Sequence, residues 1–255
     1  MNGKNVVLGI TGGIAAYRAA QIAREMTKRG AHVYCILTRN ATNFITQQTM
    51  ETLTGNPAVV DMFARPDKWE VEHIALAKRA DVFLVAPASA NFIGKVASGV
   101  ADDMLTTTVM ATRAPLLIAP AMNSNMYENP VTQRNMQTLK TLLRAQFIEP
   151  KVGLLACNDV GKGHIADDET ILEAVERALT PGDLTGKKVL VTAGPTREAL
   201  DPVRFLTNRS SGRMGYALAE AAARRGAVVP LGSGPVAREC PTGGRRECVE
   251  STQDL

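Results

Sequence analysis

The sequence has no long hydrophobic run, little net charge and no closely spaced pair of cysteines. No stretch of about 18 apolar residues occurs in the 255 residues, so we expect no membrane-spanning helix. The net charge of +4 is too small to indicate nucleic-acid binding. The four cysteines form no Cys-x-x-Cys pair, which argues against a zinc ribbon or a redox pair, and we expect no metal site.

The N-terminal segment also lacks the features of a secretory signal peptide. One lysine is followed by an apolar run that ends in glycines after only a few residues, which is too short for a signal sequence with its cleavage site. We therefore expect a cytoplasmic protein with reduced thiols. Hydrophobic residues make up 45% of the chain and charged residues 21%, as is typical of a globular protein with a sizeable core.

Apolar runs alternate with helical patterns along residues 1–180. The run over residues 5–10 ends in glycines, and apolar positions from Ala15 to Met26 then recur at helical spacing before Gly30. Further strands are predicted over 33–37, 82–85, 116–118 and 147–148, and helical stretches over 72–80, 90–113, 130–145 and 168–179. This alternation predicts an α/β fold with a doubly wound parallel sheet, flavodoxin-like or Rossmann-like.

The pattern breaks twice. Residues 151–167 contain three glycines and no sustained period, which predicts an irregular functional loop. The turn residues at 180–183 predict a domain boundary, with domains over 1–182 and 183–255. After it, strands over 188–191 and 227–229 and a helix over 212–225 are predicted. The periodicity then fades, so we expect the second α/β domain to be incomplete.

Several candidate binding residues follow the predicted strands. The turn Gly12-Gly13 precedes a helix and suits a phosphate group, although a simple tight turn is an equal alternative. It is not G-x-G-x-x-G, and the second strand ends in Thr38-Arg39 rather than in an acid, which disfavours NAD. Ser89 and Asn91 follow the third strand, where α/β folds bind ligands. The alternative is helix capping, by Ser89 and, for a second helix, by Asp102.

Three residues are candidates for catalysis, each with a plainer alternative. His73 lies near the start of a predicted helix, where a solvated surface histidine is common. Asn123 lies between two methionines after a strand, where an Asn-capped turn is the alternative. Cys157 lies in the glycine-containing segment between two lysines. It is a candidate acid or nucleophile, and the alternative is an inert buried thiol.

Together these motifs resemble the flavin-dependent cysteine decarboxylases that act on 4′-phosphopantothenoylcysteine. In the bifunctional proteins of coenzyme A synthesis, such a domain is followed by a phosphopantothenate–cysteine ligase. The decarboxylase likeness is carried by Thr11–Tyr17, His73-Ile74, Pro87–Asn91, Pro120–Met126 and Ala156–Gly161. The ligase likeness is carried by Val191–Glu198 and Asn208–Gly215.

The resemblance implies an FMN-dependent decarboxylation of 4′-phospho-N-pantothenoylcysteine to 4′-phosphopantetheine. It implies that His73 is the active-site histidine, that Asn123 holds the substrate carboxylate and that Cys157 donates a proton. The implied flavin contacts are Thr11, Gly12, Gly13, Thr38, Ser89, Asn91 and Thr106. It further implies a homo-oligomer built from trimers, with the flavin at a subunit interface, so that His73 and Asn123 serve one site from different chains.

For the ligase part, the resemblance implies CTP, Mg²⁺ and cysteine as further reactants. Gly194 and Ser211 then belong to phosphate-handling loops, and Asn208 steadies an acyl-cytidylate. The chain departs from the family at Gly163-His164-Ile165, where the family has Gly-Arg-Met, and again by ending at Leu255. From these residues we expect decarboxylase activity without ligase activity.

Two other functions compete with this prediction. One is a non-catalytic flavin-binding or regulatory protein of the same fold, which we expect to lack His73 or Cys157, and both are present. The other is a pyridine-nucleotide oxidoreductase, which the first glycine turn disfavours.

Overall fold

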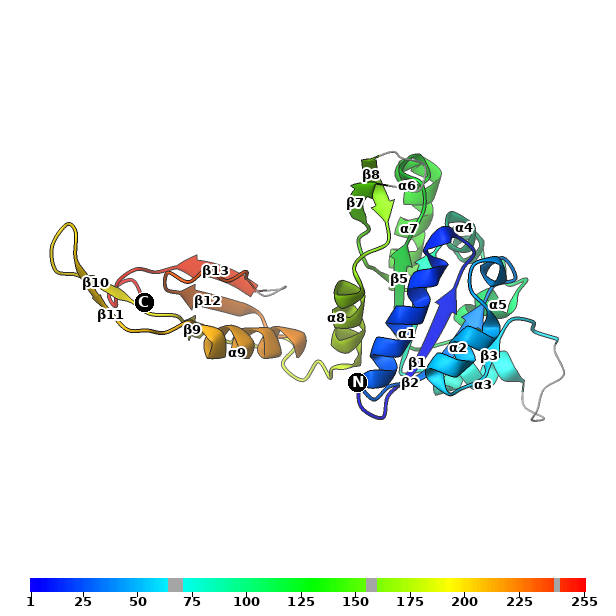
Figure 1. Cartoon of the computed structure of the whole chain (residues 1–255), viewed down its shortest axis with the longest axis horizontal. Coiled ribbons are helices and arrows are strands. Elements are labelled where there is room, and N and C mark those ends of the chain that lie inside the picture. Colours follow the sequence, from blue (N-terminus) through cyan, green and yellow to red (C-terminus); the bar gives the residue numbers. More distant parts are fainter. Residues whose placement is uncertain (64–70, 155–159, 241–243) are drawn as a thin grey trace. The chain divides into compact units, whose positions relative to one another are not determined.

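The chain forms two compact units, Met1–Leu179 and Thr180–Leu255 (Figure 1). The structure is a computed structural model that describes residues 1–63, 71–154, 160–240 and 244–255. The boundary that we propose between residues 182 and 183 lies three residues beyond the division between the units. Each unit is described separately.

The first unit is built on a six-stranded parallel sheet. Its strand order is β3-β2-β1-β4-β5-β6, with parallel pairing throughout. The strands are β1 (Asn5–Ile10), β2 (His32–Leu37), β3 (Ala58–Val59), β4 (Val82–Ala88), β5 (Leu116–Pro120) and β6 (Gln146–Phe147). The order reverses between β1 and β4, as in a Rossmann-type sheet. The prediction of a doubly wound α/β fold is confirmed.

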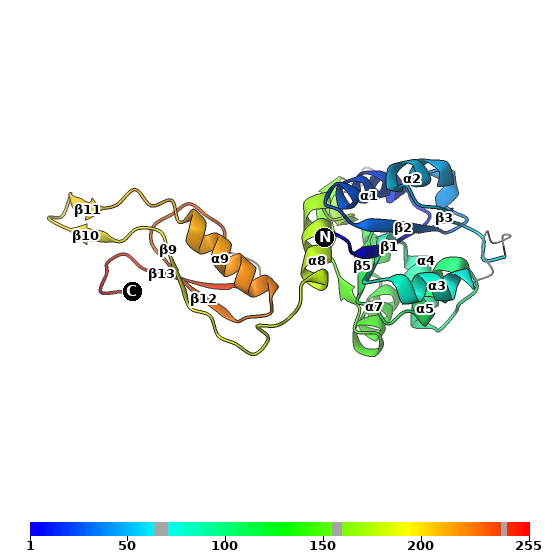
Figure 2. The same cartoon turned by 90° about the horizontal axis from the view of Figure 1, so that it is seen from below.

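Helices cover both faces of this sheet (Figure 2). One face carries α1 (Arg18–Lys28), α2 (Gln47–Thr54) and α8 (Asp168–Leu179), and the other α3 (Glu72–Arg79), α4 (Ala90–Ala97), α5 (Met104–Ala111) and α7 (Pro130–Leu142). Alternation along β1 divides the core, since Leu8 packs with Ile22 of α1 while Val7 packs with Phe92 of α4. Burying a side chain such as Ile22 contributes roughly 1.5–3 kcal/mol.

The helical stretch predicted over 90–113 is two helices. The chain turns after α4 at Gly99, whose φ is 73°, a left-handed conformation that favours glycine. The second helix, α5, begins after Asp103, whose side chain accepts a hydrogen bond from the Thr106 N–H. The predicted cap at Asp102 is therefore wrong by one residue.

The predicted loop over 151–167 is largely a two-stranded antiparallel ribbon, of β7 (Lys151–Leu154) and β8 (Val160–His164). Two of its three glycines serve close packing. A Cβ on Gly163 would lie 2.2 Å from the Met122 carbonyl oxygen, whereas a Cβ on Gly153 would meet nothing within 4 Å. A Cβ on Gly161 would lie 2.1 Å from the Ser124 hydroxyl. Where glycines replace apolar side chains at the contact face, the alternating pattern that predicts a strand is lost.

The second unit is a small α/β structure. Its strands β9 (Val191–Ala193), β12 (Val229–Ser233) and β13 (Gly244–Cys248) form a parallel sheet in the order β13-β12-β9. Helix α9 (Arg213–Arg224) packs on it through Tyr216 and Ala219. The remaining pair, β10 (Arg197–Ala199) and β11 (Phe205–Thr207), is antiparallel.

The predictions for this unit are partly wrong in position. Regular pairing of the first strand starts at Val191 rather than Lys188, which makes only an isolated bridge to Val228. The second strand runs over 229–233 instead of 227–229. Strand β13 was not predicted, because its sequence GRREC carries charges instead of an apolar face.

Candidate functional site

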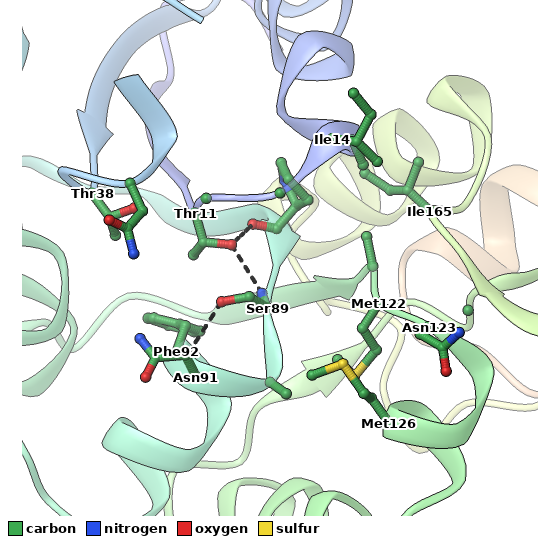
Figure 3. Close-up of a pocket in the computed structure, with 18 of the residues that line it drawn as sticks. Thr11, Ile14, Thr38, Ser89, Asn91, Phe92, Met122, Asn123, Met126 and Ile165 are labelled. Carbon is green, nitrogen blue, oxygen red and sulfur yellow. Dashed lines mark hydrogen bonds between the residues drawn. The ribbon is translucent and has the colours of Figure 1, made fainter. Parts of the chain in front are cut away.

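A pocket of about 960 Å³ opens at the carboxyl ends of the first unit's parallel strands (Figure 3). Its walls include Thr11 after β1, Thr38 after β2, Ser89 after β4 and Ala121 after β5. This is the point where the strand order reverses, and open α/β sheets bind their ligands there. The volume lies near the upper end of the roughly 300–1,000 Å³ of small-molecule sites.

Thr11 joins the ends of β1 and β4 at the floor of the pocket. Its buried hydroxyl donates to the Pro87 carbonyl oxygen at 2.8 Å and accepts from the Ser89 N–H at 2.9 Å (Figure 3). Its own N–H donates to the same carbonyl at 3.2 Å. The hydroxyl is thus engaged within the protein, and Thr11 shapes the pocket by fixing the two strand ends.

The two glycines that follow Thr11 differ in their surroundings. A Cβ on Gly12 would lie 2.5 Å from the Cβ of Asn40 and 2.8 Å from its carbonyl carbon, whereas a Cβ on Gly13 would meet nothing within 4 Å. The short helix η1 (Ile14–Tyr17) begins directly after Gly13. In the described part of the chain, neither glycine N–H has a hydrogen-bond partner. The turn therefore offers open space and backbone donors, which is what an anionic group needs.

Three more predicted polar residues line the same end of the pocket. The Thr38 hydroxyl accepts from the Ala41 N–H at 3.3 Å. The Ser89 hydroxyl accepts from the Phe92 N–H at 3.4 Å and caps α4, as the alternative interpretation expected. The Asn91 side chain lies exposed in the first turn of α4. The two hydroxyls keep a hydrogen to donate, so this end remains polar.

Thr106 and Asp103 line the pocket as a capping box at the start of α5. Beside them, the Lys95 ammonium lies 2.7 Å from Asp102 and 3.3 Å from Asp103. The hydrogen bond with Asp102 raises the pKa of Lys95 and, from the other side, lowers the pKa of Asp102. The lysine therefore stays charged and paired at neutral pH.

The opposite wall comes from the segment between β5 and the short helix α6 (Ser124–Glu128). Met122, Asn123 and Met126 line it, away from Thr38 and Asn91 (Figure 3). The Asn123 side-chain oxygen accepts from the Asn125 N–H at 2.9 Å. The predicted Asn-capped turn is confirmed, and it holds Asn123 at the pocket wall.

Strand β8 completes this wall with Gly163, His164 and the following Ile165. The Met122 N–H donates to the Gly163 carbonyl oxygen at 3.0 Å. Away from the pocket, Lys162 of β8 lies 2.7 Å from the Glu149 carboxylate, which also accepts from the Tyr127 hydroxyl of α6 at 3.2 Å. These bonds hold β8 and α6 together.

His73 and Cys157, the other two predicted catalytic residues, are not part of the pocket as it is described. His73 is half-buried in the first turn of α3 and does not line the pocket of its own chain. Cys157 lies outside the described residues. One chain therefore brings together Asn123 and all seven predicted flavin residues, but not His73.

Sequence reasoning missed the apolar and cationic side chains of the pocket. Ile14 and Tyr17 line it and are 63% and 57% exposed, and Arg18 beside them is hydrogen-bonded to Asp168 at 2.8 Å. Arg39 lines it after β2. The sequence does contain one indication for Ile14. It follows the glycine turn directly, and other residues form the buried face of the helix that it begins.

The second unit has a smaller pocket, of about 400 Å³. Gly194 and Ser211 line it, as does Arg213 at the start of α9. Asn208 does not line it; its side-chain oxygen accepts from the Ser210 N–H at 3.2 Å. The structure thus brings together two of the three residues predicted for this domain.

The described residues contain neither a metal-binding cluster nor a membrane-spanning helix. No group of three or more His, Cys, Asp or Glu side chains among them could hold a metal ion. None of their helices is both long and apolar enough to cross a membrane.

A doubly wound parallel sheet with a large, partly polar pocket at its switch point defines a cofactor-binding α/β protein. The chain belongs to the flavoprotein family, which it matches over residues 1–180. Residues 184–255 match the DNA/pantothenate metabolism flavoprotein C-terminal domain.

Two similar relatives are coenzyme A biosynthesis bifunctional proteins named CoaBC. The protein of Vibrio cholerae serotype O1 is 47% identical over 255 residues, which are 99% of this chain and 63% of that protein. The protein of Bacillus subtilis is 47% identical over 246 residues, or 95% of this chain and 60% of that protein. The chain thus spans about three fifths of the length of these relatives.

Solved structures resemble the first unit. A PPC decarboxylase mutant complexed with pantothenoylaminoethenethiol is 31% identical, with a TM-score of 0.61, over 68% of this chain and 96% of that one. The FMN-dependent cysteine decarboxylase SpaF is 29% identical, with a TM-score of 0.58, over 68% of this chain and 98% of that one.

Proposed function

We propose that the first unit catalyses the FMN-dependent decarboxylation of 4′-phospho-N-pantothenoylcysteine to 4′-phosphopantetheine, a step of coenzyme A synthesis. The observation that carries the proposal is one large pocket with an open glycine turn at one end and Asn123 at the other. The family membership and the names of the similar proteins support it. We also propose a cytoplasmic location, in keeping with the free thiols of the three described cysteines.

The glycine-turn end fits FMN. The free N–H groups and open space at Gly13 suit its phosphate, while Ser89 and Asn91 offer polar contacts. Thr11, Gly12, Thr38 and Thr106 shape this end through the contacts described above. When bound, FMN would take a hydride equivalent from the substrate's cysteine and later return it, which provides the electron sink that decarboxylation requires.

The other end holds the substrate. We assign Asn123 to the substrate carboxylate, since its amide nitrogen is a neutral donor that orients the carboxylate without a strong ion pair. Once the substrate's cysteine carbon chain is oxidised to a thiocarbonyl, the C–CO₂ bond breaks and its electron pair forms an ene-thiolate. Cys157 then gives a proton to carbon, because a thiol with an ordinary pKa near 8.5 is protonated at neutral pH and is a competent acid.

We assign His73 to a site on a neighbouring chain. It does not line the pocket of its own chain, whereas Ile14, Tyr17 and Met126 at the pocket are 50–63% exposed large apolar side chains. Such side chains around a site are typical of an interface with another copy. We therefore propose a homo-oligomer built from trimers, in which His73 acts beside Asn123 of the next chain.

The second unit is proposed as part of a phosphopantothenate–cysteine ligase that uses CTP, Mg²⁺ and cysteine. Gly194 and Ser211 share its pocket and suit phosphate handling, and Asn208 is assigned to the acyl-cytidylate. Because the parallel sheet of this unit has only three described strands, we expect no release of cytidine monophosphate from CTP with phosphopantothenate and cysteine present, and clear release would contradict that expectation.

The decarboxylase proposal is tested by incubating the purified chain with synthetic 4′-phosphopantothenoylcysteine. We expect a yellow protein, release of CO₂ and formation of 4′-phosphopantetheine in equal amounts. A yellow protein that releases no CO₂ would instead favour the non-catalytic flavin-binding function.

A further inference from the structure

His164 presents a titratable nitrogen at the substrate end of the pocket. It is the last residue of β8, is half-buried and lines the wall shared with Asn123. Its Nδ1 lies 3.1 Å from the Ile165 carbonyl oxygen, which can only accept, so Nδ1 carries a hydrogen. The second ring nitrogen, Nε2, is then an acceptor in the neutral ring and becomes a donor only when the ring is protonated.

Two permanent cations of the pocket are already paired. The Arg18 guanidinium lies 2.8 Å from Asp168, and Lys95 pairs with Asp102 and Asp103. Arg39 belongs to the cofactor end, because it follows β2 next to the residue that packs on Gly12. Along the wall of Met122, Asn123 and Met126, His164 is therefore the described side chain that can supply positive charge.

Charged groups on the elements around His164 are largely paired with one another. Lys151 of β7 lies opposite His164 in the ribbon and forms an ion pair with Asp167. The preceding Lys162 pairs with Glu149.

Two further charges of the described residues near this wall lie at the start or end of a helix. Asp168 at the start of α8 pairs with Arg18, and Glu128 ends α6 on the surface. A bound anion at this wall would therefore interact favourably with a protonated His164 ring.

We propose that His164, as a protonated ring, binds an anionic oxygen group of the substrate. The inference rests on the proposed function, whose substrate carries a carboxylate at one end and a phosphate at the other. His164 is thus a specificity-determining residue for an anionic group of the substrate.

Two variants separate charge from shape. His164→Arg keeps a cation at every pH, and His164→Gln keeps a neutral hydrogen-bonding side chain. A hydrogen bond to a charged group corresponds to about a 10- to 100-fold change in affinity. We expect His164→Gln to lower kcat/KM by that factor, mainly through KM, and His164→Arg to retain the wild-type value.

The two anionic groups are distinguished by the compound used. Pantothenoylcysteine lacks the phosphate, and 4′-phosphopantetheine lacks the carboxylate. If His164 contacts the phosphate, the difference between wild type and His164→Gln disappears with pantothenoylcysteine and persists in calorimetric binding of 4′-phosphopantetheine. If it contacts the carboxylate, the two results are reversed.

The controls make the result decisive. The phosphate of the substrate titrates near pH 6, but it does so equally for all three proteins, so only differences between them count. Equal flavin content and equal melting temperatures show that the fold is intact. If wild type turns over and His164→Gln has the same KM, the inference is overturned while the proposed function stands. If no protein releases CO₂, the proposed function fails, and calorimetric binding of 4′-phosphopantetheine and of pantothenoylcysteine to wild type and His164→Gln still tests His164.

Discussion

Alanine substitutions at Gly12 and Gly13 are expected to have different effects. Gly12→Ala should lower the stability of the fold, and Gly13→Ala should lower the affinity for FMN. At Gly13, the φ of 179° is extended backbone that alanine adopts readily, and its Cβ would meet no protein atom within 4 Å. Gly13→Ala should therefore leave the unfolding free energy of the apoprotein unchanged or raise it by about 0.4–1 kcal/mol. The new methyl group would occupy the space assigned to the FMN phosphate.

The loss of FMN affinity can be estimated from the bonds at the turn. Each hydrogen bond to a charged group contributes about 1.5–3 kcal/mol, so losing one backbone bond to the phosphate lowers the affinity at least about tenfold. Gly12→Ala is the matched variant. Its Cβ would lie 2.5 Å from the Cβ of Asn40 and 2.8 Å from its carbonyl carbon, and such overpacking destabilises by about 1–3 kcal/mol.

Denaturant unfolding of the apoproteins and fluorescence titration with FMN measure the two effects separately. We expect Gly13→Ala to be as stable as wild type and to bind FMN weakly, and Gly12→Ala to be less stable. Wild-type FMN affinity in Gly13→Ala would refute the placement of the phosphate at this turn. Equal destabilisation by both substitutions would refute the assignment of different roles.

Three further predictions follow from the site and its supports. Cys157→Ser should bind FMN and release CO₂ but form little 4′-phosphopantetheine, because a serine hydroxyl is a far weaker acid; normal product formation contradicts the assignment. His73→Asn and Asn123→Asp should each be inactive, yet mixed oligomers of the two should regain activity if the site is shared between chains; a mixture with no activity argues against sharing. The Lys162 ammonium lowers the pKa of Glu149. Their pairing therefore stabilises the fold at pH values above the ordinary carboxyl pKa, and this stabilisation is lost as the pH falls through the lowered pKa. Because both side chains are substantially exposed, Lys162→Met should cost at most about 1 kcal/mol at pH 7 and less at pH 3, and an equal cost at both pH values would exclude this pairing.

The main sheet could be predicted from the sequence because its central strands are buried on both faces. The run over 82–88 in β4 is entirely buried, and such continuous apolar runs are typical of parallel strands between two layers of helices. The polar residues at the strand ends were found for the same reason, since the carboxyl ends of parallel strands meet at one edge.

The ribbon of β7 and β8 could not be predicted in this way. Gly161 and Gly163 contact Ser124 and Met122 through bare backbone, so the contact leaves no apolar signal in the sequence. The position of His164 at the pocket wall likewise follows from the register of this ribbon, which the sequence pattern does not reveal. The placement of His73 outside the pocket of its own chain depends on tertiary packing, which a local motif does not contain.

The hydroxyl of Thr11 fixes one part of the pocket through hydrogen bonds within the protein. By bridging Pro87 and Ser89, it sets the spacing between the ends of β1 and β4 before any ligand arrives. Binding then requires little ordering of the chain at this point, which lowers the entropic cost of binding. The opposite wall can vary in sequence. Substitutions on β8 and α6 can change which ligand binds there without disturbing the strand ends that line the cofactor end of the pocket.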